Sequence, residues 1–179
     1  MNRARFGSAG YDLFLPAALL PSFASSLASA ANNPVGRFCG WEAAEIARIE
    51  AGIPKFGTDM DETNIPLEAG VESSAISFNK GCYIGQEVIS RIRTYSEISK
   101  ALRGLRLADD LKALPGKGEK LYKEGKEAGY VTSAIRSPRL GANIALAYVK
   151  KEANQAGAEL MLRGAAGESS AKIVALPFV

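Results

Sequence analysis

The sequence predicts an α+β protein whose first part is rich in helices and whose second part is a small antiparallel β-barrel. Two observations lead to this expectation. In the first half, apolar residues recur at helical spacing, at Ile46 and Ile49 and again within residues 88–92. After Arg93, the apolar period becomes two, and short apolar stretches alternate with glycine-bearing turns. Short strands at this density are typical of small barrels and sandwiches.

The change of period places a linker near residues 96–102 and divides the chain into two domains, residues 1–97 and 98–179. A chain of 179 residues is long enough to bury a core in each. In the second domain, residues 144, 146 and 148 should face one way and residues 145, 147 and 149 the other. The strands are expected near residues 105–107, 120–123, 128–132, 144–149, 159–163 and 171–176, with turns at residues 124–127 and 164–167.

In the first domain, the pattern predicts a short helix over Trp41–Glu50, in which Glu45 can pair with Arg48 three residues on. Gly52, followed by an apolar residue and a proline, is a typical helix stop. The acidic residues 59, 61 and 62 lack the glycine and the terminal glutamate of a calcium loop, so we expect a solvated acidic loop there.

The stretch from Leu13 to Gly36 carries no charged residue, and Ala28-Ser29-Ala30 resembles an export cleavage site. Two prolines and several serines interrupt the apolar run, which is too weak for a membrane span. A strand over residues 10–16 that ends at a proline, followed by a surface helix over residues 17–30, explains the stretch better.

Composition excludes several kinds of chemistry. The chain has no histidine and only two cysteines, Cys39 and Cys82, so it cannot build a histidine-activated nucleophile, a histidine metal site or a four-cysteine cluster by itself. We therefore expect no metal site. A formal charge of +3 without a dense basic run argues against direct nucleic-acid binding, and we expect no membrane association. The few cysteines suit a reducing cytoplasm.

The strongest chemical signal is the segment Lys-Gly-Cys-Tyr-Ile-Gly-Gln-Glu at residues 80–87. Its two glycines allow sharp turns on both sides of Cys82, and a helix is expected to begin near Gly85. A thiol ahead of a helix N-terminus, with Lys80 close in sequence, is in a setting that favours the thiolate. The alternative is that Cys82 is a small buried apolar residue in a tight turn.

This segment resembles the central motif of the YgfZ-type folate-binding proteins, which are relatives of the glycine-cleavage T-protein, an aminomethyltransferase. The resemblance extends to residues 48–62 and 66–70 ahead of the motif, and more weakly to residues 129–133, 137–138 and 144–149. It implies that residues 1–97 are part of a T-protein-like folate-binding domain and that residues 98–179 are its C-terminal barrel. It also implies that a further domain precedes the chain in the family.

The resemblance implies a folate-binding accessory factor that supports iron-sulfur cluster assembly or repair, and through it tRNA modification. Its partners would be iron-sulfur client proteins or assembly factors, possibly with the missing N-terminal domain, and its cofactor tetrahydrofolate or a related reduced folate. The alternatives are a tetrahydrofolate-dependent aminomethyltransferase and a non-catalytic fragment of either. The implied acting residues are Cys82 and Lys80, and the implied folate-binding residues are Asp12, Tyr83, Gly81, Gly85, Gln86 and Glu87.

Overall fold

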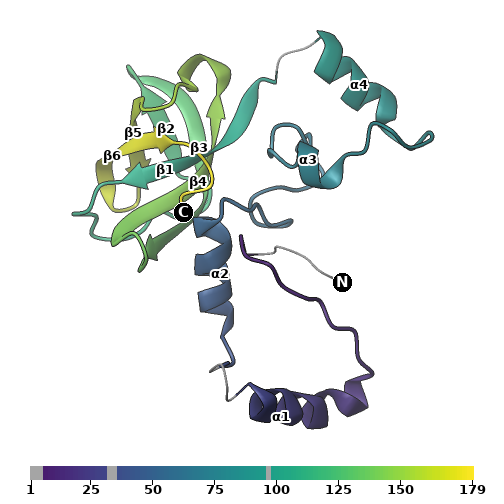
Figure 1. Cartoon of the computed structure of the whole chain (residues 1–179). Helices are drawn as coiled ribbons and strands as arrows, with labels where there is room; N and C mark the ends of the chain where they lie inside the picture. The colour runs from purple at the N-terminus through teal and green to yellow at the C-terminus, as the bar shows by residue number, and fades with distance from the viewer. Residues whose placement is uncertain (1–5, 32–35, 96–97) are drawn as a thin grey trace.

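Six antiparallel strands close into a barrel in the second part of the chain, and the helices of the first part lie beside it (Figure 1). The structure is a computed structural model that describes residues 6–31, 36–95 and 98–179. Around the barrel the strands follow the order β1-β4-β3-β2-β5-β6. The helices are α1 (Leu20–Ala30), α2 (Trp41–Glu50), α3 (Glu72–Ala75) and α4 (Gln86–Tyr95), and the strands are β1 (Lys100–Leu107), β2 (Lys120–Lys123), β3 (Lys126–Ser137), β4 (Ala142–Lys150), β5 (Glu159–Gly164) and β6 (Gly167–Val174).

The predicted antiparallel barrel is therefore confirmed, and its strands are longer than the sequence pattern indicates at β1 and β3. The turn between β2 and β3 is shorter than expected, because only Glu124 and Gly125 separate the two strands. Both have positive φ, 51° and 78°, as tight hairpins require.

Strand β4 separates two apolar layers, as its alternation predicts. Ala145, Ala147 and Val149 belong to the core inside the barrel, together with residues such as Leu105. On the other face of β4, Ile144, Leu146 and Tyr148 belong to a second core outside the barrel. The second core also contains Ile49, Leu102, Leu176 and Phe178. Helix α2 and the C-terminal tail thus cover one outer face of the barrel.

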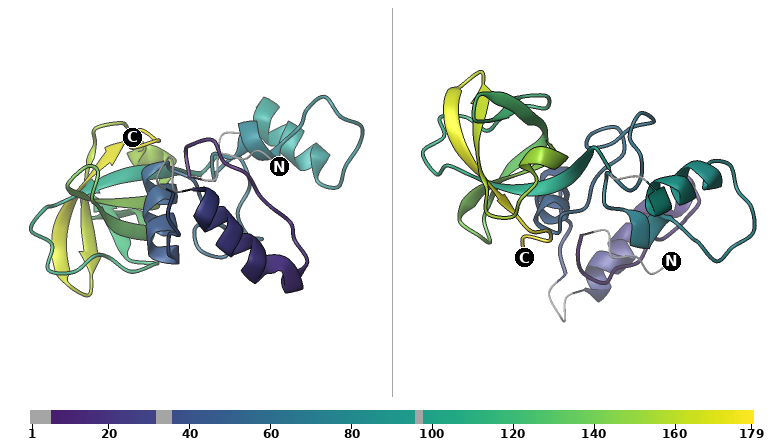
Figure 2. Two further views of the ribbon diagram at one scale, coloured as in Figure 1. Left: turned by 60° about the horizontal axis from the view of Figure 1, so that its bottom comes forward. Right: turned by 90° about the horizontal axis from the view of Figure 1, so that it is seen from above.

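Helix α2 has the predicted bounds and the predicted end. Gly52 is left-handed, with φ +68°, its N–H donates to the carbonyl of Ile49, and the next N–H donates to the carbonyl of Arg48. Arg48 and Glu45 form the expected ion pair at 2.7 Å. Helix α2 contacts β3 and β4 of the barrel, and the loop that follows it leads on toward α3 (Figure 2).

Two expectations for the first part are wrong. Residues 10–16 form no strand and contain a single bridge residue, Tyr11. A strand needs a continuous hydrogen-bonded partner, and one bridge does not provide it. The linker is also shorter than expected, because Lys100–Leu102 already belong to β1 and Leu102 is buried; residues 96 and 97 lie outside the described residues.

The expected helix is present as a 3-10 turn, Ala17–Leu19, followed by α1. Within the described residues, no helix has the length and apolar character needed to cross a membrane.

Candidate ligand-binding cavity

A cavity of about 400 Å³ lies between the loop that follows α2, the segment around α3, and the start of α4. Most of its lining is apolar, and five residues with polar side-chain groups contribute to it. Its volume falls within the range of small-molecule sites. The lining residues are Phe56, Met60, Asp61, Asn64, Pro66, Ala69, Val71, Ala75, Ile76, Ser77, Lys80, Tyr83 and Ile89.

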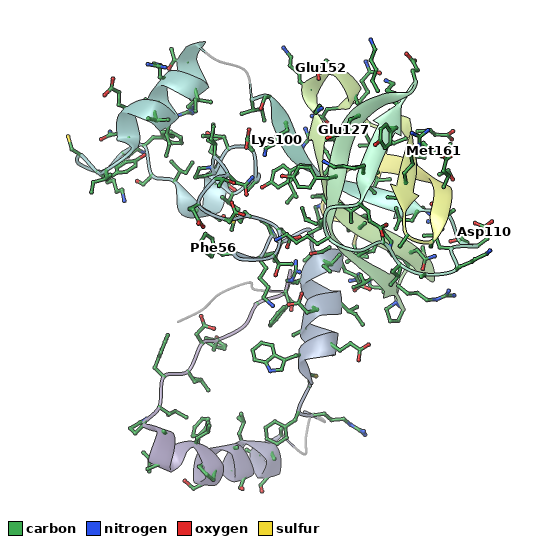
Figure 3. All side chains as sticks on the ribbon, turned by 180° about the vertical axis from the view of Figure 1, so that it is seen from behind. Phe56, Lys100, Asp110, Glu127, Glu152 and Met161 are labelled. Atoms are coloured by element: carbon green, nitrogen blue, oxygen red, sulfur yellow. The ribbon has the colours of Figure 1, made fainter. Side chains whose placement is uncertain are left out.

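The first wall of the cavity is a tight turn after α2 that carries Phe56 and Met60. The N–H of Gly57 donates to the carbonyl of Met60 at 2.7 Å, and Phe56 and Met60 form a bridge. Gly57 has φ +83°, a conformation that glycine adopts without strain. Figure 3 shows Phe56 on this loop, beside the part of the chain that contains α3.

Asp59 holds this turn against the barrel. Its side chain is fully buried and accepts hydrogen bonds from Arg48 Nη1 at 2.8 Å and from the N–H of Lys55 at 3.0 Å. On the barrel side, the hydroxyls of Thr132 and Ser133 lie 2.6 Å and 2.5 Å from Asp59 Oδ1. The carboxylate is therefore fully satisfied, and it connects α2, the turn and strand β3.

This arrangement corrects the expectation of a solvated acidic loop at residues 59, 61 and 62. Glu62 is exposed as expected and Asp61 is partly exposed, whereas Asp59 has an exposed fraction of only 2%. The loop composition gives no sign of this burial, because two of the groups that satisfy Asp59, the hydroxyls of Thr132 and Ser133, come from β3, more than 70 positions away. Within the described residues, no cluster of three or more histidine, cysteine, aspartate or glutamate side chains could hold a metal ion.

The motif at residues 80–87 contributes two side chains to the cavity, Lys80 and Tyr83. Lys80 Nζ lies 4.7 Å from the centre of the Tyr83 ring, within the range of a cation–π contact. The Tyr83 hydroxyl is shielded from solvent and has no hydrogen-bond partner among the described residues. A ligand that places a polar atom beside this hydroxyl would satisfy it.

Cys82 is exposed and does not line the cavity, so the alternative of a buried cysteine is wrong. The neighbouring Ile84 is also fully exposed. Cys39, the other cysteine, is exposed on the segment before α2. The motif thus presents its cysteine to solvent and its lysine and tyrosine to the cavity.

The remaining predicted site residues lie near the cavity or apart from it. Gly85 has φ +89° and ends the turn, and α4 begins at Gln86, which confirms the expected helix start. Gly81 and Glu87 are exposed, with Glu87 in the first turn of α4. Asp12 lies in the arm ahead of α1 and does not line the cavity. The structure therefore brings together Lys80 and Tyr83, but neither Cys82 nor Asp12 with them.

Asp61 supplies a carboxylate to the cavity. The side-chain hydroxyl and the backbone N–H of Thr63 both donate to Asp61 Oδ1, at 2.6 Å and 2.9 Å. These hydrogen bonds hold the pKa of Asp61 below its ordinary value, so the carboxylate is ionised at neutral pH. With Lys80 as a cation, the cavity offers an apolar interior, an acceptor and a positive charge. This combination suits a flat heterocycle that carries N–H donors and an anionic group.

The sequence of the chain was compared with family models and with known proteins. Residues 100–179 match the family model described as the glycine cleavage T-protein C-terminal barrel domain. The chain is 30% identical over 172 residues to an aminomethyltransferase of Halalkalibacterium halodurans, a match that covers 96% of this chain and 46% of that relative. It is 34% identical over 172 residues to an aminomethyltransferase of Rubrobacter xylanophilus, with 96% of this chain and 44% of that relative covered.

A solved structure with the same fold is that of the glycine cleavage system aminomethyltransferase T from Bartonella henselae. The TM-score is 0.83 at 21% sequence identity, and the match covers 98% of this chain and 48% of that one. At this identity the likeness establishes the fold alone. The chain spans about half the length of the relatives that it matches.

Proposed function

Since residues 100–179 form a glycine cleavage T-protein C-terminal barrel and the similarity to aminomethyltransferases supports the T-protein family, we propose that the chain takes part in folate-dependent aminomethyl transfer. Its part is to supply a binding surface for a reduced folate. The comparisons favour this function over the YgfZ-type accessory factor, which they do not confirm. The match covers 46% and 44% of these two relatives, and the rest of their length lies outside it.

One observation carries the proposal: Lys80 and Tyr83, both from the motif, line a largely apolar cavity of about 400 Å³. A reduced folate has a flat pterin with N–H donors, an aromatic linker and a carboxylate-bearing glutamate. The Tyr83 hydroxyl, which lacks a partner among the residues that the structure describes, and the Asp61 carboxylate fit the polar edge of the pterin. Lys80 suits the glutamate carboxylate. When bound, a reduced folate supplies the acceptor for a one-carbon unit.

The proposal is tested by titrating the protein with 5-formyltetrahydrofolate, a stable reduced folate, and measuring binding by calorimetry. Tyr83→Phe should weaken binding by about 10-fold, because the ligand loses one hydrogen bond to a group without another partner. Lys80→Met should weaken binding of the full folate but not of a pterin that lacks glutamate. Ser90→Ala is the matched control, because Ser90 is exposed on α4 and does not line the cavity. No binding, or equal binding by all variants, would refute the proposal.

A second candidate function rests on Cys82. Its exposed position on the loop ahead of α4 leaves the sulfur accessible to another protein, as an accessory factor for iron-sulfur client proteins or assembly factors would require. Cys82→Ala should then fail to complement a strain that lacks such a factor, while folate binding stays unchanged. Full complementation by this variant would eliminate the second candidate.

A further inference from the structure

A second cavity lies at one end of the barrel, apart from the cavity proposed for folate. It has a volume of about 360 Å³ and lies between the loop after β1 and the start of β6 with the turn that precedes it. Figure 3 shows Asp110, on this loop, on the side of the barrel away from Phe56. The mouths of β-barrels are frequent places for small-molecule sites. We call it the barrel-end cavity; besides two alanines, its lining residues are Asp110, Leu111, Lys112, Glu168, Ser169 and Ser170.

The walls of the barrel-end cavity are held by contacts with the barrel. The N–H of Ala108 donates to the carbonyl of Ser170 at 3.1 Å, and the side-chain amide of Asn143 donates to the carbonyl of Ala108 at 2.9 Å. Leu111 packs against the core inside the barrel. The loop after β1 is therefore anchored on both sides of Asp110.

Ser169 places an unsatisfied hydroxyl in this cavity. It alternates along β6 with Ala171 and Ile173 and lies opposite Leu162 on β5, and these three residues belong to the core inside the barrel. The side chain of Ser169 therefore faces the barrel interior. Its Oγ is shielded from solvent and has no hydrogen-bond partner among the described residues. Since buried hydroxyls are ordinarily hydrogen-bonded, a molecule in the cavity would supply the partner.

The loop after β1 contributes two opposite charges that are available to a ligand. Within the described residues, neither the Asp110 carboxylate nor the Lys112 ammonium forms a hydrogen bond or an ion pair. Glu168, in contrast, pairs with Arg163 at 2.7 Å, and Arg163 lies 4.4 Å from the centre of the Tyr122 ring. Asp110 and Lys112 are two positions apart, so their Cα atoms are separated by at most about 7 Å. The cavity thus offers one negative and one positive charge close together.

The composition of the lining selects the chemical class of the ligand. No aromatic side chain lines the cavity, which disfavours a nucleobase, because bases stack on aromatic rings. One leucine and two alanines are the apolar part of the lining, so a lipid chain would bury little apolar surface. Two carboxylates disfavour a phosphate, and no described cluster could hold a metal ion. A small molecule that carries both an ammonium and a carboxylate matches the available groups.

We propose that the barrel-end cavity binds a free polar α-amino acid. The Asp110 carboxylate accepts hydrogen bonds from the ammonium of the amino acid, and the Lys112 ammonium and the Ser169 hydroxyl donate to its carboxylate. In an α-amino acid both charged groups are attached to one carbon atom, which suits the short separation of Asp110 and Lys112. Glu168 and Ser170 leave the rest of the cavity polar, so a polar side chain fits it better than an apolar one.

Thermal unfolding of the whole 179-residue chain, with each L-amino acid of proteins added singly at about 10 mM, is the first test. At least one polar amino acid should raise the melting temperature, and calorimetry should then give a Kd of about 1 mM or tighter. The primary amide of this amino acid lacks the carboxylate, and its N-acetyl derivative lacks the ammonium. Each should bind at least about 5-fold more weakly.

Charge variants locate the amino acid in the cavity. Asp110→Asn and Lys112→Met should each weaken binding at least about 5-fold. Asp109→Asn and Lys172→Met are the matched controls, because they make the same changes of charge at exposed residues that do not line the cavity. Both controls should bind as the wild type does. Lys80→Met, in the cavity proposed for folate, should also leave binding of the amino acid unchanged.

Ser169→Ala separates binding from folding. Without ligand it should leave the melting temperature unchanged or raise it, because it removes an unsatisfied hydroxyl, whereas it should weaken binding of the amino acid about 5-fold. Four outcomes would overturn the proposal: no amino acid binds, both derivatives bind as well as the amino acid, Asp109→Asn weakens binding as much as Asp110→Asn, or Lys80→Met abolishes binding. None of these outcomes decides the folate proposal, whose cavity has other lining residues.

Discussion

Arg48 and Asp59 form a buried ion pair, with 2.8 Å between Arg48 Nη1 and Asp59 Oδ2. The pair lies where α2, the turn after α2 that lines the cavity, and the barrel meet. Both side chains are almost fully excluded from solvent, at 6% and 0% exposure. Removal of one partner leaves the other charge buried and unpaired. We expect Asp59→Ala to lower the free energy of unfolding by about 3 to 5 kcal/mol, measured by urea denaturation.

Asp59→Asn and Lys55→Ala serve as controls for this pair. The asparagine keeps an acceptor for the hydroxyls of Thr132 and Ser133, so it should cost less than alanine. Lys55 pairs with Glu45 at the surface, and its loss should cost less than about 1 kcal/mol. If Asp59→Ala lowered the free energy of unfolding no more than Lys55→Ala does, the buried pair would not be what holds the turn after α2 against the barrel.

Glu45 makes stability depend on pH. The hydrogen bond from Arg48, with a smaller contribution from Lys55, lowers the pKa of Glu45 below its ordinary value of 4.5. The unfolded chain therefore binds this proton more readily, and the contribution to stability is complete above about pH 4.5 and is lost as the pH falls through the folded pKa. Because Glu45 is one-third exposed, this contribution is below about 1 kcal/mol.

The variant Glu45→Gln isolates this effect. At about pH 7 it should be slightly less stable than the wild type, and the difference should vanish at about pH 3, where the wild-type carboxyl is protonated too. Urea denaturation of both proteins at several pH values measures the difference. A gap that is constant with pH, or that widens in acid, would contradict the assignment of the lowered pKa to this ion pair.

The sequence predicts local features of this fold well. The stop of α2 at Gly52 and the alternation of β4 follow from neighbouring residues, and both are confirmed. The alternation alone does not say which face of β4 is inside the barrel, because both faces are apolar. That choice depends on α2 and the C-terminal tail, which supply Ile49 and Phe178 to the outer core.

Long-range contacts explain what the sequence does not reveal. Two of the partners that satisfy the buried Asp59 are hydroxyls from β3, and a solvated acidic loop would have the same composition. The strand expected over residues 10–16 has suitable alternation, but alternation does not supply a pairing partner. Likewise, proximity in the chain does not place Cys82 in the cavity beside Tyr83, because successive residues of a turn point in different directions.

Gly129 is required for the close approach of β3 and β4. A Cβ at this position would lie 2.0 Å from the backbone carbonyl oxygen of Tyr148, which cannot move away without breaking the barrel ladder. Gly129→Ala should therefore cost about 3 kcal/mol or more and lower the melting temperature by roughly 10 °C or more. Gly116→Ala is the control, because a Cβ there meets only the end of the Glu119 side chain at 3.9 Å. Equal melting temperatures for the two variants would contradict this account.

Tyr148 is only 1% exposed, and its buried hydroxyl has no hydrogen-bond partner within the part of the chain that the structure describes. Burial, with nearby Tyr130 and Glu68, raises the pKa of Tyr148, so the hydroxyl stays neutral. Lys100, which lies at the start of β1 (Figure 3), contacts both rings, with its Nζ 4.9 Å from the centre of the Tyr148 ring, but its hydrogen bond goes to the Tyr130 hydroxyl.

Tyr148→Phe should therefore leave stability unchanged or raise it by about 1 kcal/mol, because it removes an unsatisfied polar group and keeps the ring. Tyr130→Phe should lower stability by about 1 kcal/mol, because it removes the acceptor of the Lys100 bond. Urea denaturation at neutral pH compares the two. A loss of more than about 1 kcal/mol for Tyr148→Phe would mean that this hydroxyl has a partner in solution, and that the core between α2 and the barrel holds a polar contact there.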